Sequence, residues 1–473
     1  MPPRLPDVDP LPPMSPRERI ARGRAARDRL PLAAHARWDP SSRFADPVAI
    51  LEQQARTRDP ALVPLRHERM LASPFAFFRG GAAIMAADLA TTPITGLRCQ
   101  LCGDAHLLNF GLFDSPERLR LFDINDFDET LAGPWEWDVK RLAASIEVAG
   151  LDLGFHDDER RRAVLACVRQ YRQQMGAFAE QSNLEVWYAR LDVEAFEERL
   201  SHAKHRADAK KIEHDLRKGL KRNHLTAFSK MVESTGGEAR FVNKPPLLVP
   251  VEELLDDDGW RRYVEVMRQF LGRYRSSLST HVRHLLDEYR YVHLARKVVG
   301  VGSVGTRAWV VLMVGRDAAD PLILQLKEAQ RSVLEPYAGP FDGKSKGRRV
   351  VEGQRLIQAA ADPLLGWYRL VALDGRRHDF YVRQLWDGKA SIDVTQLSPS
   401  GLTLYAETCG WSLARAHART GMRISIAAYL GESDRFDKAV ADFAAIYADV
   451  NRSDHVALAG AVEEGRLSAA TSV

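Results

Sequence analysis

The spacing of hydrophobic residues changes several times along the chain. Across residues 157–290, apolar side chains recur three or four positions apart, as at Val164, Cys167 and Val168, and this period predicts helices. Across residues 291–395 the pattern changes to short runs rich in β-branched residues, bounded by turn residues, which predicts strands. The chain is therefore predicted to be an α+β protein.

The same patterns divide the chain into four parts. Residues 1–40 are rich in Pro and Arg, with a short basic helix predicted at Arg17–Arg29, and are predicted to form a flexible basic arm or a surface helix. Residues 41–290 contain a strand–loop–strand unit and then a helical insertion at about 157–290. Residues 291–395 are predicted to be β-rich, and residues 396–473 return to helix and end in a tail that is expected to fray.

Composition narrows the class of protein. The 473 residues carry a formal net charge of +4, which is too small for this length to argue for or against nucleic acid. No run of about twenty apolar residues is present, so no membrane-spanning helix is expected. Four cysteines in so long a chain are typical of reduced thiols, and a cytoplasmic protein is therefore expected.

One stretch, residues 203–222, is rich in Lys and Arg. Asp208, Glu213 and Asp215 are interleaved there at helical spacing. Such a mixture favours a solvated helix with internal salt bridges over a surface that binds anions. A nucleic-acid partner is therefore not expected.

Polar residues gather between two strand-like runs in the first part. Asp104 is followed by His106 and Asn109, and the next apolar run carries Asp123 and Asp126. Phosphoryl transfer requires a carboxylate that orients or deprotonates the attacking hydroxyl, and oxygen ligands such as a carboxamide and a second carboxylate that hold Mg²⁺. The residues are therefore candidates for such a site, and the alternative is an exposed turn whose acids keep it soluble.

A glycine-rich segment follows the first strand of the β-rich part. Gly300, Gly302 and Gly305 match the pattern G-x-G-x-x-G, with Ser303 between them. A dinucleotide-binding fold places a helix directly after such glycines, but residues 309–314 are strand-like. The segment is therefore predicted to belong to a hairpin whose backbone N–H groups approach phosphates, as in kinases.

The next strand-like run, residues 322–327, ends in Lys327. A Lys in this position, after a glycine hairpin and a further strand, resembles the kinase lysine that contacts the α- and β-phosphates of ATP. The alternative is a Lys that is merely exposed at a strand end. Glu352, on a helix predicted at 348–360, is the candidate ion-pair partner of Lys327, because the nearer Glu335 precedes a proline.

The sequence Gly-Asp-x-His-x-x-Asn, followed by a hydrophobic strand with an Asp, resembles the catalytic loop of the aminoglycoside and choline phosphotransferase branch of the protein-kinase-like superfamily. Protein kinases carry Lys at the place of His106. One departure is Cys102, since that branch usually has His before the Gly. The segment also resembles the bacterial domain of unknown function 2252 family, which is grouped with kinase-like folds.

The resemblance implies a two-lobed protein-kinase-like fold that holds ATP and Mg²⁺ in its cleft. Asp104 would be the catalytic base, and His106 would position the acceptor hydroxyl or brace the loop. Asn109 and Asp123 would hold Mg²⁺. Asp126 is the rival of Asp123, because it begins an Asp-Phe-Asp sequence similar to the kinase Asp-Phe-Gly.

The resemblance also implies how the nucleotide would be held. The segment Gly300–Gly305 would cover the phosphates, and Lys327, oriented by Glu352, would bind the α- and β-phosphates. The turn at 386–388 would be the hinge whose backbone contacts adenine.

The order of these parts differs from that of a kinase, in which the glycine hairpin comes before the catalytic loop. Here residues 41–290 and 396–473 resemble the C-lobe, and residues 291–395 resemble the N-lobe. A circular permutation would explain this order, since break points at the surface are tolerated. It predicts that the helix Leu404–Arg419 packs beside Cys102–Asn109.

Together these features predict an ATP- and Mg²⁺-dependent phosphotransferase that acts on an unidentified, small-molecule hydroxyl acceptor. The alternative is a nucleotide-binding sensor or scaffold without transfer activity. A metallophosphatase lacks support because the chain has no Gly-Asn-His sequence, and a nicotinamide-dependent enzyme is disfavoured by the strand after the glycines. Asp138, which precedes an apolar helical run, is expected to support the catalytic loop rather than take part in chemistry.

Overall fold

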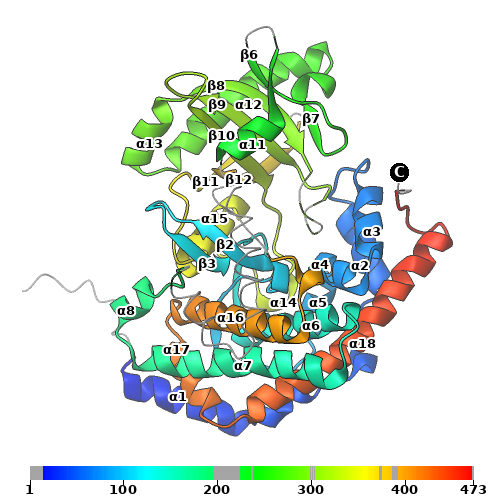
Figure 1. Ribbon diagram of the computed structural model, residues 1–473, viewed down its shortest axis with the longest axis vertical. Helices are drawn as coiled ribbons and strands as arrows, with labels where there is room; N and C mark the ends of the chain where they lie inside the picture. The colour runs from blue at the N-terminus through cyan, green and yellow to red at the C-terminus, as the bar shows by residue number, and fades with distance from the viewer. Residues whose placement is uncertain are drawn as a thin grey trace, which may run out of the picture.

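A sheet with a few helices occupies one end of the molecule, and a large helical region occupies the other (Figure 1). The computed structural model describes residues 14–192, 194, 224–235, 238–298, 300, 302, 304–371, 375–385 and 392–470. The protein is therefore mixed α+β, as the hydrophobic patterns predict. The predictions for 203–222, for 386–388 and for Ser303 lie outside the described residues.

The main sheet has six strands in the order β11-β12-β10-β9-β8-β7, and neighbouring strands are antiparallel. Their bounds are β7 Leu248–Pro250, β8 Arg290–Lys297, β9 Ala308–Val314, β10 Pro321–Glu328, β11 Gly366–Val371 and β12 Arg377–Gln384. The strands expected at 309–314 and 322–327 are thus confirmed as β9 and β10. Pro250 is tolerated in β7 because this is an edge strand, where a missing N–H breaks no ladder.

Both faces of this sheet are covered. Successive residues of a strand point to opposite faces, so Val311 and Met313 of β9 pack in one apolar cluster and Val310 and Leu312 in another. The first cluster includes residues of α12 (Asp257–Ser276) and α13 (Thr280–Asp287). The second includes residues of α11 (His224–Met231) and of the hairpin β5 (Val232–Thr235) and β6 (Glu238–Phe241). Because neither face meets solvent, β9 reads as a continuous apolar run.

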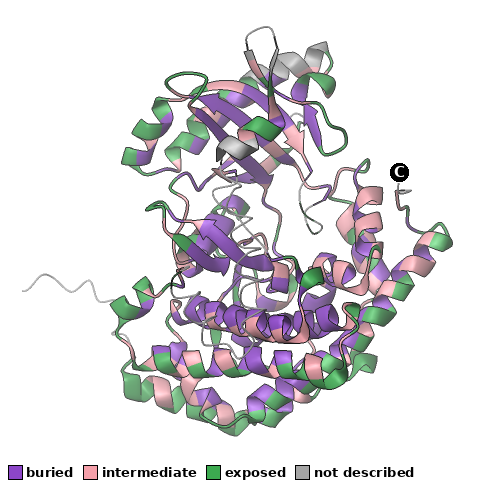
Figure 2. Ribbon diagram, in the orientation of Figure 1, coloured by how far each residue is buried: buried purple, intermediate pink, exposed green. Residues whose placement is uncertain are grey.

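The helical region is built around a helix that is buried on all sides. Residues 135–150 of α6 are all buried, and Figure 2 shows the buried residues at the centre of this region. The surrounding helices are α1 Pro16–Arg29, α7 Asp157–Glu180, α8 Asn183–Tyr188, α16 Pro399–Ala418, α17 Arg423–Leu430 and α18 Arg435–Glu463, and α6 itself spans Trp135–Asp152. Helices α7 and α16 approach closely, because Gly410 of α16 has no side chain to meet the carbonyl of Cys167.

Buried ion pairs join parts of this region that are distant in sequence. Arg43 contacts Asp88 at 2.8 Å and Asp454 at 2.7 Å. Arg172 of α7 contacts Asp437 of α18 at 2.8 Å. Buried charges of this kind are tolerated because each is paired and hydrogen-bonded, and loss of one partner would leave the other uncompensated.

Four short helices lie between the helical region and the sheet: α2 Pro47–Ala55, α3 Val63–Leu71, α4 Pro74–Gly80 and α5 Ala82–Leu89. The end of the chain is attached to α3, not frayed from Glu463 as expected. The N–H of Ala470 donates to the carbonyl of Pro64 at 3.0 Å, and the ring of His67 lies 2.7 Å from the carbonyl of Ser468.

Two other expectations also change. Within the arm expected at 1–40, α1 packs against α17, and Gly23 lies so close to the carbonyl of Ser425 that a Cβ would stand 2.2 Å from it. The insertion expected at 157–290 is not one unit, since α7 packs in the helical region whereas α12 and α13 cover the sheet. Hydrophobic spacing does not reveal a contact made by small residues such as those of α1. It also does not reveal that α7 packs in the helical region while α12 and α13 pack on the sheet.

The strand–loop–strand unit is confirmed and lies between the sheet and α6. Its strands are β1 Arg98–Leu101, β2 Phe110–Asp114, β3 Arg120–Ile124 and β4 Leu131–Pro134, with β1 paired to β4 and β2 to β3. Helices α14 (Glu335–Ala338) and α15 (Lys346–Ile357) connect it to the sheet. Within the described ranges, no helix has both the length and the apolar character needed to cross a bilayer.

Candidate active site

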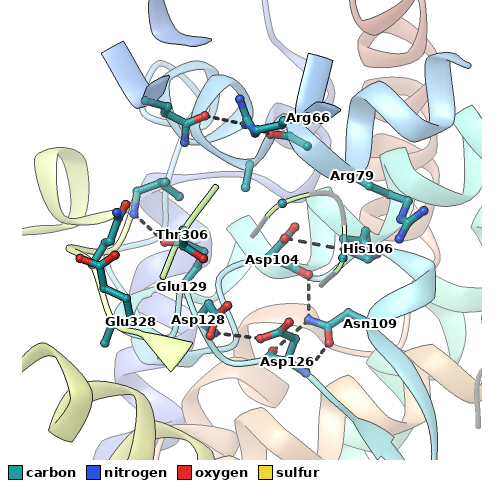
Figure 3. Close-up of a pocket in the computed structure, with 18 of the residues that line it drawn as sticks. Arg66, Arg79, Asp104, His106, Asn109, Asp126, Asp128, Glu129, Thr306 and Glu328 are labelled. Carbon is teal, nitrogen blue, oxygen red and sulfur yellow. Dashed lines mark hydrogen bonds and ion pairs between the residues drawn. The ribbon is translucent and has the colours of Figure 1, made fainter. Parts of the chain in front are cut away.

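A cavity of about 310 Å³ lies where the strand–loop–strand unit, the glycine segment and helices α2–α5 meet. Six of the residues singled out in the sequence line it: Asp104, His106, Asn109, Asp126, Gly300 and Gly302. They come from chain segments almost two hundred residues apart, and Figure 3 shows the polar side chains converging on one space. The structure therefore joins the two candidate motifs in one site.

The turn that carries Asp104 is fixed by backbone contacts. Asp138, on α6, accepts hydrogen bonds from the N–H groups of Cys102 at 2.8 Å and Gly103 at 3.1 Å. Gly103 has a φ of +84°, and a Cβ there would stand 2.3 Å from the carbonyl of Glu129, so both conformation and space require glycine. The supporting role expected of Asp138 is confirmed, although it lies inside α6 rather than ahead of it.

Asp104 presents its carboxylate to the cavity and is held from behind. Its Oδ1 accepts a hydrogen bond from Nε of Arg141 at 2.7 Å. His106 lies 3.9 Å from the other carboxylate oxygen. Burial lowers the pKa of His106 to about 4, so the imidazole is neutral near pH 7 and the contact is not an ion pair. Arg141 thus fixes the carboxylate, while His106 can only donate or accept a neutral hydrogen bond.

Asn109 joins the turn to the segment after β3. Its Nδ2 donates to the carbonyls of Asp104 and Asp126, each at 3.0 Å, and its Oδ1 accepts from the N–H of Asp126 at 2.6 Å. The side chain is buried. In this arrangement the amide oxygen of Asn109 holds the position of Asp126.

Lys327, at the end of β10, reaches the same segment. Its Nζ lies 3.3 Å from Oδ2 of Asp126 and 3.1 Å from Oδ2 of Asp128. Burial alone would lower the pKa of Lys327, but the two carboxylates outweigh burial and raise it. The Tyr381 hydroxyl also donates to Asp128. A cation from the sheet is therefore held against two acids of the strand–loop–strand unit.

Asp123 lies away from the cavity. Both of its oxygens are 2.5 Å from the guanidinium of Arg415 on α16, and Oδ2 accepts from the N–H of Ala359 at 2.7 Å. The side chains of the pair are each 1% exposed. Asp126, by contrast, lines the cavity. Of the two aspartates that sequence spacing left open, Asp126 is the one positioned to meet a ligand.

Glu352 does not contact Lys327, as had been expected. It lies on the exposed side of α15 and pairs with Arg348 at 2.6 Å. The inward position of this helix is taken by Arg349, which donates to the carbonyls of Thr130 and Asp128. Helical spacing placed Glu352 on the correct helix but gave no information on which side of it faces the strand.

The glycine segment is tied to the short helices beside it. Arg69 donates to the carbonyl of Gly300 at 2.6 Å, and the N–H of Asp59 donates to the carbonyl of Gly305 at 2.7 Å. Arg58 donates to the carbonyl of the intervening Val304. Gly305 has a φ of +85°, which favours glycine.

The residues present suit a hard cation at one place. Within the described part of the chain, no three or more His, Cys, Asp or Glu side chains form a metal-binding group. Mg²⁺, however, is usually bound by one or two carboxylates together with substrate phosphates. Asp126 and Asp128, which share Lys327 and both line the cavity, supply such carboxylates.

Helix α16 packs beside the turn, as predicted for Leu404–Arg419. The hydroxyl of Tyr405 donates to the carbonyl of Leu107 at 3.1 Å and to that of Phe110 at 2.9 Å. His417, near the end of the helix, lies 3.3 Å from Asp138. Segments about three hundred residues apart thus pack against each other at the turn.

A protein-family model described as an uncharacterised protein conserved in bacteria (DUF2252) matches residues 58–461. The chain belongs to this family. The match covers the strand–loop–strand unit, the sheet and α16. Of the residues that line the cavity of this DUF2252 protein, Gln54 on α2 lies before the matched region and the others lie within it. No curated protein and no solved structure matches the chain.

Several residues of the DUF2252 site were not found from the sequence. Arg141 lies one helical turn after Asp138 on the same face of α6, a spacing that could have identified it. Asp128 is the last residue of the Asp-Phe-Asp sequence that begins with Asp126, so its place in that sequence could have identified it. Arg66 lines the cavity from α3 and belongs to no motif that identifies a ligand. Arg79, which lines it from α4, could be considered from the sequence because a guanidinium suits phosphate oxygens, but an ion pair with a carboxylate was the favoured alternative.

Proposed function

We propose that this DUF2252 protein is an ATP- and Mg²⁺-dependent phosphotransferase with a two-lobed, kinase-like fold that acts on a hydroxyl group of a small molecule. The observation that carries the proposal is the contact of Lys327 with Asp126 and Asp128. This Lys, which follows a glycine segment and a strand, meets two acids that line the same cavity as Asp104. Positioned cations and carboxylates around phosphates are what phosphoryl transfer requires.

In this proposal each side chain has a defined task. Lys327 binds the α- and β-phosphates, and the glycine segment covers them. Asp104, fixed by Arg141, accepts a hydrogen bond from the acceptor hydroxyl and orients it. Mg²⁺ held by Asp126 and Asp128 would neutralise charge on the phosphate oxygens. The acceptor oxygen bonds to the γ-phosphorus, the bond to the β–γ bridging oxygen breaks, ADP leaves, and the hydroxyl proton passes to Asp104 or to water.

The permuted order of the chain is part of the proposal. Helix α16, which would precede the catalytic loop in an unpermuted chain, contacts that loop through Tyr405 although it follows the sheet in sequence. A permutation preserves such packing because only the connections change. The size of the cavity, about 310 Å³, lies at the lower end of the range for small-molecule sites, which favours a small acceptor, and ATP as donor favours a cytoplasmic protein.

The experiment that tests the function is substitution of Asp104. Asp104→Asn should lower ATP-dependent transfer or ATP turnover at least about a hundredfold, because the variant cannot accept the hydroxyl proton, while binding of a fluorescent ATP analogue persists. Asp158→Asn, which alters an exposed pair on α7, is the matched control and should turn over normally. Wild-type turnover in Asp104→Asn would contradict the assignment.

A second candidate is a nucleotide-binding protein without transfer activity. It is favoured by Asn109, whose amide oxygen is engaged by the N–H of Asp126, and by the ion pair of Asp104 with Arg141. Nucleotide binding with no ADP formation across a broad panel of hydroxyl compounds would support this candidate over the phosphotransferase.

A further inference from the structure

One side of the cavity is basic. Arg66 on α3 and Arg79 on α4 line it, and in Figure 3 they lie above Asp104 whereas Asp126 and Asp128 lie below. The acids and Lys327 pair with one another, so the opposite side keeps its positive charge.

Arg66 is a buried cation whose charge is not balanced by a carboxylate in the described parts of the chain. Arg66 is 1% exposed. Nη2 donates to Oε1 of Gln54 at 2.8 Å and to the carbonyl of Gly80 at 3.0 Å, but Nε and Nη1 are buried and have no hydrogen-bond partner. Burial lowers the pKa of Arg66, and repulsion by Arg58 lowers it further.

Arg79 lies closer to the proposed chemistry. Its Nε is also buried without a hydrogen-bond partner. Burial lowers the pKa of Arg79, and attraction to Asp104 opposes this. Asp104 already pairs with Arg141, so one carboxylate is shared by two guanidinium groups. Excess positive charge therefore lies next to Asp104, the residue that would orient the acceptor.

We propose that the acceptor carries, besides its hydroxyl group, a phosphate or carboxylate group that binds between Arg66 and Arg79. This inference rests on the proposed function and names the substrate class for the same site. Guanidinium groups suit such oxyanions because their fixed N–H geometry matches two oxygens at once. The anion would offset the cost of burying Arg66, whose charge no carboxylate balances in the described parts of the chain, beside the partly buried Arg79.

The test uses the full-length chain and inorganic phosphate as probe. Phosphate binding is measured by calorimetry without and with a saturating, non-hydrolysable ATP analogue and Mg²⁺. Wild type should bind phosphate in both conditions, because the donor and acceptor anions occupy different places. Loss of phosphate binding when the analogue is present would assign the arginines to the nucleotide phosphates and overturn the proposal, as would absence of binding to wild type.

Variants locate the anion. Arg79→Gln should weaken phosphate binding about tenfold or more, since a charged hydrogen bond is lost, and should leave affinity for the analogue within about threefold. Arg79→Lys should restore part of the phosphate affinity. Arg66→Gln should behave like Arg79→Gln, and Arg162→Gln, on an exposed pair of α7, is the matched control. Wild-type phosphate affinity in both Gln variants would overturn the proposal.

Folding of each variant is checked by circular dichroism and urea unfolding, and Arg79→Gln decides if Arg66→Gln does not fold. The outcomes also separate the two proposals. Analogue binding without phosphate binding would leave the nucleotide assignment standing and overturn the anionic acceptor. Phosphate binding that depends on Arg79, without any analogue binding, would establish the anion site and contradict the proposed phosphotransferase.

Discussion

Glu129 lies in the wall of the cavity as a buried carboxyl group. Burial raises its pKa from the ordinary 4.5 to about 7, while Arg349 and the N–H of Val333 act in the opposite direction. The folded protein therefore favours the protonated form more than the unfolded chain does. It follows that Glu129 contributes stability below about pH 4.5, and that this contribution is lost as the pH rises through 7.

Glu129→Gln should therefore remove a pH dependence. Between pH 5 and pH 8, wild type should lose up to roughly 3 kcal/mol of unfolding free energy relative to the variant, from a pKa change of about 2.5 units. Urea unfolding at each pH measures this difference. Glu464→Gln, at an exposed site beyond α18, should follow wild type throughout. A wild-type-to-Glu129→Gln difference that is equal at pH 5 and pH 8 would refute the assignment.

Asp126 and Asp123 should respond to substitution in opposite ways. Asp126→Asn should weaken Mg²⁺-dependent nucleotide binding about tenfold or more with little loss of stability, because Asp126 is 46% exposed at its side chain. Asp123→Asn should destabilise the fold by about 3–5 kcal/mol, because it leaves Arg415 buried and unpaired. Mg²⁺ titration and urea unfolding of both variants measure the two effects. Exchanged results would restore Asp123 as the ligand.

These two aspartates show which site residues could be predicted from the sequence. Asp104, His106, Asn109 and Asp126 were found because their types and spacing match a chemical requirement. Asp123 was preferred as the metal ligand, but it lies outside the cavity and pairs with Arg415, which is 292 positions away in the sequence. A spacing along the chain carries no information on such a partner.

At the scale of elements, the contact between α7 and α16 depends on a missing side chain. A Cβ at Gly410 would stand 2.3 Å from the carbonyl of Cys167. Gly410→Ala should therefore destabilise the protein by about 1–3 kcal/mol, since the helices must separate. A Cβ added at Gly176 on α7 would have no neighbouring atom within 4 Å. Gly176→Ala should therefore be neutral or stabilising by up to about 1 kcal/mol. Thermal unfolding of both variants checks this, and equal effects would contradict the packing argument.

Elements with a strong hydrophobic period were predicted and others were not. Strands β9 and β10 and helix α16 were found because they are apolar runs with clear turn residues at their ends. The short basic helix predicted at Arg17–Arg29 is confirmed as α1, but its packing was missed because α1 packs through Gly23 and Ala26 and most of its other residues are polar. Small residues at a close contact leave no hydrophobic signal, so its docking on α17 is visible only in three dimensions.

For the molecule as a whole, the order of motifs in the sequence predicted which distant segments pack together, although no single motif determined the fold. The expectation that Leu404–Arg419 lies beside the Asp104 turn came from comparing that order with a kinase, and the contacts of Tyr405 agree with it. The positions of α2–α5, which bring Arg66 and Arg79 to the cavity, could not be inferred in this way. They depend on tertiary contacts such as the pair of Arg43 with Asp88 and Asp454.

The three hydrogen bonds from Arg58, Asp59 and Arg69 to the glycine segment have a mechanical consequence. All three originate within a stretch of twelve residues that also contains Arg66. Displacement of the segment must therefore either break these bonds or move the stretch Arg58–Arg69 with it, so the segment is not free to move as an isolated loop. Movement of the segment and movement of Arg66 are then coupled.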